Sequence, residues 1–62
     1  MSKLSNETRK PTQDINRALD ELLTVAEREG MEETATMIDD AAVLVASIRR
    51  SFFQAGYKKE NP

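Results

Sequence analysis

The chain has 62 residues, a length that suits one small domain. It carries 11 acidic and 9 basic side chains for a net charge of -2, and it has no cysteine and no histidine. These counts exclude disulfides, thiol nucleophiles, imidazole bases and ordinary zinc sites, so we expect no enzyme, no cofactor and no metal. Because no apolar run approaches the roughly 18 residues of a membrane span and the sequence shows no charged-then-apolar leader, we expect a cytoplasmic protein with no membrane partner.

The first part of the chain is polar and shows no sustained apolar period, so the sequence predicts a flexible N-terminal tail over residues 1–10. Pro11 has a fixed φ and lacks an N–H group, which favours the first turn of a helix. The sequence therefore predicts a first helix over about residues 12–29. Its main apolar residues recur every three or four positions and share one face: Ile15, Leu19, Leu22 and Ala26.

Gly30 is the residue type best able to close a helix in the left-handed conformation, so we expect a turn at residues 30–31. Two glutamates follow at once, where the positive end of a helix dipole favours carboxylates. The sequence predicts a second helix over about residues 32–55, ended by Gly56, and a polar C-terminal tail over residues 57–62. The apolar period of this helix runs through Thr34, Ile38, Ala41, Val45, Ile48 and Phe52.

Two helices joined by so short a turn are antiparallel neighbours, so the fold class is all-α, an antiparallel two-helix hairpin over residues 11–56. A chain below about 70 residues rarely builds a sufficient core without disulfides, metal or association. The apolar arc of the second helix, roughly 180° wide, also exceeds what one neighbour covers. We therefore expect hairpins to pair into a four-helix bundle, as a homodimer or higher oligomer, although docking on a larger partner is the alternative. The expected interface comprises Ile15, Leu19, Leu22, Met37, Ile38, Ala41, Leu44, Val45, Ile48 and Phe52.

Charge is segregated along the chain. Residues 1–17 carry a net charge of +2, residues 18–48 carry -7 and residues 49–62 carry +3. A hairpin brings both basic segments to its open end and leaves the acidic segment around the turn. Complementary charge can then orient two antiparallel hairpins, or the basic end can bind phosphate, nucleic acid or an acidic protein, and the two roles are compatible.

The acidic pairs Asp20-Glu21 and Asp39-Asp40 fall at the same level of the expected hairpin. Oxygen ligands of this kind suit Mg²⁺. Neighbouring residues on a helix diverge by about 100°, however, so each pair sends only one carboxylate toward a shared position. We therefore expect no metal site there.

These observations favour a small regulator, adaptor or inhibitor that acts by binding another protein. Its candidate contact residues combine positive charge with exposed apolar or aromatic side chains: Arg17, Val43, Arg49, Arg50, Phe53 and Tyr57. One alternative is an RNA- or DNA-binding dimer that uses its basic ends, with polar groups from Lys10, Gln13, Asn16 and Arg17. Another is capture of a phosphorylated small molecule at a subunit interface.

Overall fold

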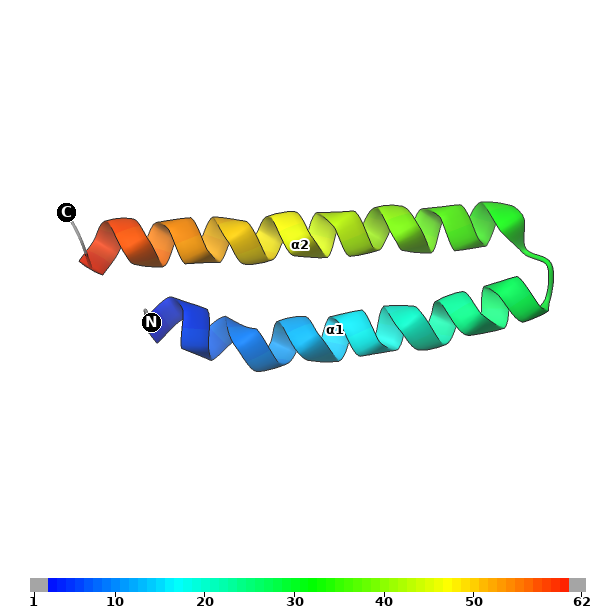
Figure 1. The fold of residues 1–62 in the computed structure, drawn as a ribbon, viewed down its shortest axis with the longest axis horizontal. Helices are drawn as coiled ribbons and strands as arrows, with labels where there is room; N and C mark the ends of the chain where they lie inside the picture. Colours follow the sequence, from blue (N-terminus) through cyan, green and yellow to red (C-terminus); the bar gives the residue numbers. More distant parts are fainter. Residues whose placement is uncertain (1–2, 61–62) are drawn as a thin grey trace.

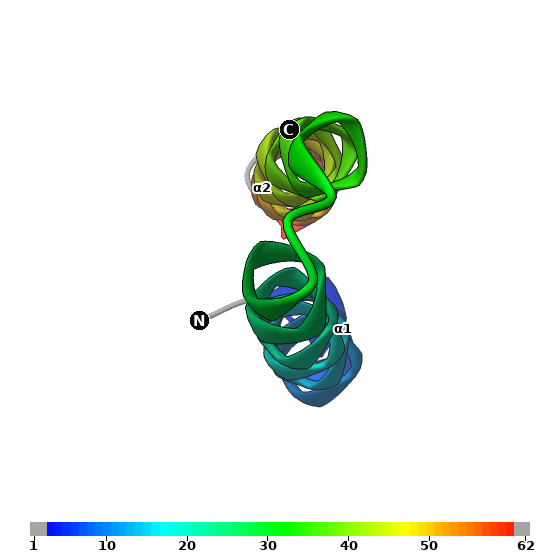
Figure 2. The ribbon, with the colours of Figure 1, turned by 90° about the vertical axis from the view of Figure 1, so that its right-hand side faces the viewer.

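The computed structural model describes residues 3–60, which form two α-helices, α1 (Lys3–Arg28) and α2 (Glu32–Glu60). The helices lie side by side and antiparallel, so the start of α1 and the end of α2 are at the same end of the rod (Figure 1). Seen end-on, the described chain is a single pair of helices with nothing packed on either broad side (Figure 2). The prediction of an all-α chain with two helices packed against each other is confirmed.

The turn at Gly30 reverses the chain within three residues. Gly30 has a φ of 69°, in the left-handed region. The Met31 N–H donates to the Ala26 carbonyl at 2.8 Å, and the Gly30 N–H donates to the Glu27 carbonyl at 3.2 Å. These two bonds form a Schellman closure of α1. The Met31 carbonyl in turn accepts from the Ala35 N–H at 2.9 Å and starts α2.

We expect Gly30→Ala to lower the free energy of unfolding by about 1 kcal/mol, because an L side chain is strained at this φ. Steric crowding does not contribute, since no atom lies within 4 Å of the position that a Cβ would take. Gly30→Asn should lose less, because Asn tolerates the left-handed conformation. Urea unfolding followed by circular dichroism measures both changes, and equal losses would contradict this explanation.

The core between the helices is small. In the described part of the chain the buried hydrophobic residues are Ala26, 2% exposed, and Val45, 9% exposed. The Cα radius of gyration is 14.6 Å, against about 11 Å for a compact domain of this length. The remaining contact is made by half-buried residues, which are Leu4, Ser5, Thr8, Thr12, Leu19 and Leu23 from α1 and Thr34, Ala35, Ile38, Ala41 and Ala42 from α2.

The N-terminal boundary differs from the expected one. Helix α1 begins at Lys3, so the expected tail is wrong for residues 3–10, while residues 1–2 lie outside the described chain. Pro11 lies inside the helix and leaves the carbonyl of Glu7 without its usual helical donor. That carbonyl belongs to an exposed residue, where water can replace the missing donor.

Packing on α2 explains why the helix extends through Pro11. Leu4, Thr8 and Thr12 follow one another at steps of four and are all half-buried. The Thr8 hydroxyl donates to the Leu4 carbonyl at 2.8 Å, and the Thr12 hydroxyl donates to the Thr8 carbonyl at 2.6 Å. Because these hydroxyls are satisfied within the helix, both threonines can face α2 at little cost.

The C-terminal boundary differs as well. Helix α2 continues through Gly56 to Glu60, so the expected tail is wrong for residues 57–60, and residues 61–62 lie outside the described chain. Gly56 is buried, and together with Leu4 it lines a hollow between the start of α1 and the end of α2. Tertiary contact therefore keeps this glycine in a helix that local preference alone would end.

Candidate binding surfaces

A pair of helices leaves two broad faces, each made of one flank of α1 and one flank of α2. An open hollow of about 370 Å³ contains Asn16 of α1 together with Ala46 of α2, so these two flanks share one face. A hollow near the turn likewise contains Glu27 of α1 with Ala35 of α2. We call this side of the hairpin the hollow face.

The opposite side is apolar. Ala46 and Leu44 flank the buried Val45, each turned by about 100° from it, so Leu44 lies on the side away from the hollow face. By the same spacing around Ala26, Val25 lies opposite Glu27. Seven large side chains that are 40% to 63% exposed gather on this side, which we call the apolar face: Ile15, Leu22, Val25, Met37, Leu44, Ile48 and Phe52.

The exposed area of the hairpin is large for its mass. The accessible surface is 5100 Å², whereas a compact monomer of 7.0 kDa exposes about 4,000 Å². The excess of about 1,000 Å² is close to the roughly 800 Å² that each partner buries in a standard protein interface. The hairpin as a whole therefore exposes more surface than a compact chain of its mass, and the apolar face holds seven of the eleven exposed large hydrophobic residues in the described part of the chain.

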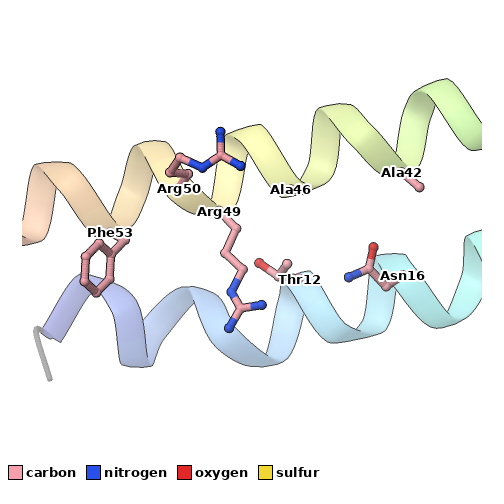
Figure 3. Close-up of a pocket in the computed structure, with 7 residues that line it drawn as sticks. All are labelled: Thr12, Asn16, Ala42, Ala46, Arg49, Arg50 and Phe53. Atoms are coloured by element: carbon pink, nitrogen blue, oxygen red, sulfur yellow. The ribbon is translucent and has the colours of Figure 1, made fainter.

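The hollow face carries a basic and aromatic depression toward the open end. The Arg49 side chain extends from α2 across to α1 and lies beside Thr12, while the Phe53 ring points toward the start of α1 (Figure 3). We call this depression the open-end hollow. It is lined by Thr12, Asn16, Ala42, Ala46, Arg49, Arg50 and Phe53.

A smaller hollow of about 140 Å³ adjoins the first, and both are lined by Arg49 and Phe53. Its lining also includes Arg9 of α1. No carboxylate in the described part of the chain forms an ion pair with Arg49 or Arg50. Guanidinium groups beside an aromatic ring can bind a carboxylate or a phosphate together with an apolar group.

The structure divides the expected interface residues into two groups. Val45 is buried between α1 and α2 of the same hairpin, and Leu19, Ile38 and Ala41 are half-buried there. These four residues are therefore occupied within one chain. The other six of the expected set are exposed on the apolar face: Ile15, Leu22, Met37, Leu44, Ile48 and Phe52.

The candidate contact residues are brought together only in part. Arg49, Arg50 and Phe53 line the open-end hollow, and Tyr57 follows Phe53 by one turn with 60% of its surface exposed. Two others lie apart from the hollow. Arg17 is about 180° from Ala26 around α1, and Val43, 67% exposed, is about 160° from Val45 around α2.

Sequence reasoning did not assign Thr12 and Arg9 to this site, and it left Val25 out of the expected interface. Thr12 stands one turn after Thr8, and the regular step of four from Leu4 onward is the signal that places the start of α1 against α2. A search for apolar residues at helical spacing misses this period, because Thr8 and Thr12 are polar.

The acidic pairs do not form a shared cluster. Among residues 3–60, no group of three or more acidic side chains is placed to hold a metal ion. Neither helix contains, over those same residues, a stretch long and apolar enough to cross a membrane.

Comparisons with protein-family models, with curated proteins and with solved structures find no match for this chain. A functional proposal therefore rests on the two surfaces, the apolar face and the open-end hollow.

Proposed function

We propose that this chain is a non-enzymatic binding protein in which two hairpins pair through their apolar faces into a four-helix bundle. In this pair the open-end hollow of each hairpin binds another protein, so that the dimer acts as a regulator, adaptor or inhibitor. The observation that supports pairing most directly is the contrast between a core of Ala26 and Val45 and seven large, exposed side chains on one face. Burial of such a surface is the main driving force of association.

The chemistry of the open-end hollow supports a protein partner. Arg49 and Arg50 supply directional donors, Phe53 supplies an aromatic wall, and Ala42 and Ala46 leave room between the helices. Arginine and aromatic residues are the types that contribute most to protein interfaces. The matching partner surface is a short acidic stretch that also carries an apolar side chain.

Sedimentation equilibrium of the full chain at micromolar concentration tests the pairing. We expect a particle with twice the 7.0 kDa mass of one chain. A folded particle of 7.0 kDa over the whole micromolar range would overturn the proposal.

Affinity capture from the native host tests the partner site. The wild-type chain should recover a specific polypeptide, and Phe53→Asp should lose it while still sedimenting as a dimer. Val43→Asp is the matched control, because Val43 is exposed but lies outside the hollow. Retention of the same polypeptide by Phe53→Asp would show that the hollow is not the contact surface.

A second candidate is binding of RNA or DNA, which the basic residues at the open end favour. A mixed RNA pool would then be retained on filters at low salt, and the double variant Arg49→Ala, Arg50→Ala would weaken retention. The net charge of -7 over residues 18–48 opposes a long polyanion, which is why a protein partner ranks first. Heat stabilisation by nucleotides would instead indicate a phosphorylated small molecule.

A further inference from the structure

We infer that the two hairpins pair with their turns at opposite ends, so that α1 lies on α1 of the second copy and α2 lies on α2 of the second copy. This inference rests on the pairing proposed above and specifies its geometry. The partner that covers the apolar face is a second copy of this chain.

Two arrangements place a pair of apolar faces together with the helices aligned and a two-fold axis between them. If the turns are at the same end, α1 packs on α2 of the second copy. If the turns are at opposite ends, each helix packs on its own equivalent. Neighbouring helices are antiparallel in both arrangements, so helix packing alone does not distinguish them.

The charge of the segments distinguishes the arrangements. The helices around the turn carry the net charge of -7 of residues 18–48, while the open end joins the basic segments 1–17 and 49–62. Turns at the same end would crowd the two acidic regions against each other. Turns at opposite ends place each acidic region on a basic one, and complementary potentials of this kind set the orientation of a complex.

Single residues at the edge of the apolar face agree with the segment charges. Glu21 of α1 and Asp40 of α2 lie at the same level of the hairpin and on the same side. Turns at the same end therefore bring Glu21 against Asp40 of the second copy, and Asp40 against Glu21 of the second copy. Turns at opposite ends bring Glu21 instead to Lys10 of the second copy, which also pairs with Asp14 of its own chain at 3.2 Å. Glu21 then meets an ammonium group rather than another carboxylate, and Asp40 no longer faces Glu21.

The corresponding edge of α2 gives a second complementary pair. Glu33 and Lys58 lie on one side of α2, at nearly equal distances before and after Val45. A two-fold axis near Val45, with the turns at opposite ends, therefore brings Glu33 to Lys58 of the second copy. The opposite-end arrangement also brings Lys3 of one chain near Arg28 of the second copy. Each of these cations already has a carboxylate in its own chain, because Lys3 pairs with Glu7 at 3.9 Å and Arg28 pairs with Glu29 at 3.2 Å, and these pairs offset the repulsion.

Pulsed electron paramagnetic resonance tests the orientation. The chain has no cysteine, so each single-cysteine variant takes one spin label. Ser47→Cys places the label on the outward side of α2, near the middle of its length. Because neighbouring helix axes are about 10 Å apart, the two labels of a dimer then lie within about 30 Å of each other in either arrangement. Met31→Cys places the label at the turn, where opposite ends give about 40 Å at 1.5 Å per residue and equal ends give less than about 25 Å.

Each outcome of this experiment decides one of the two proposals. A coupled Ser47→Cys pair with Met31→Cys labels about 40 Å apart supports the opposite-end arrangement. A coupled Ser47→Cys pair with Met31→Cys labels less than about 25 Å apart overturns this arrangement and leaves the dimer intact. Absence of dipolar coupling at both positions, in a chain that remains helical, overturns the pairing itself.

Discussion

Leu44→Glu should weaken pairing of the hairpins by more than about 100-fold, or about 3 kcal/mol, whereas Val43→Glu should leave it unchanged. The two residues are adjacent and are almost equally exposed in one hairpin, at 63% and 67%. Only Leu44 lies on the apolar face. A two-fold interface receives every substitution twice, so Leu44→Glu removes two apolar anchors and buries two carboxylates without partners.

Sedimentation and urea unfolding at several protein concentrations measure this difference. For a dimer, the unfolding midpoint should rise with protein concentration in the wild type and in Val43→Glu. For Leu44→Glu the midpoint should be lower and independent of concentration. Equal behaviour of the two variants would show that Leu44 does not lie at a contact between chains.

Val45→Asp should abolish most of the helical signal of the chain. Val45, 9% exposed, is the only side chain larger than alanine in the buried core of the described residues. An unpaired carboxylate at such a position costs several kcal/mol, while a domain of this size is stabilised by about 3 to 9 kcal/mol in total. The substitution should therefore consume most or all of the stability of the hairpin.

Val43→Asp is the control, because it makes the same chemical change two residues away at an exposed position. Circular dichroism at 222 nm should show little loss for this control and a large loss for Val45→Asp. Similar helical content and similar unfolding midpoints in both variants would contradict the assignment of Val45 to the contact between α1 and α2.

The apolar period and Gly30 were sufficient to predict two antiparallel helices, because both depend on local properties of the chain. The ends of the helices were not predictable in the same way. Pro11 and Gly56 have strong local preferences for helix ends, but the packing contact of the start of α1, where Leu4 is half-buried, with the end of α2, where Gly56 is buried, outweighs them. That contact joins the two ends of the chain, and no local window of sequence contains it.

The sequence was sufficient to predict which residue types form the candidate surfaces. It was not sufficient to predict which residues of α1 and α2 lie together on each surface. The sequence identifies Arg49 and Phe53 as unusual exposed residues, but it does not say which flank of α1 accompanies them. The antiparallel packing of the two helices decides this, and it places Asn16 beside them while Arg17 lies on the far side of α1. Three consecutive residues show the same effect: Val43 faces outward, Leu44 lies on the apolar face and Val45 is buried.

The open-end hollow lies on the side of the hairpin opposite the apolar face, and this has a consequence for the paired molecule. With the turns at opposite ends, the two hollows open away from each other, one at each extremity of the bundle. The proposed dimer would then be bivalent, and we expect it to link two separate partner molecules rather than to bind one partner with both hollows. A target with repeated sites on separate chains would thus be tethered with an avidity beyond that of either site alone.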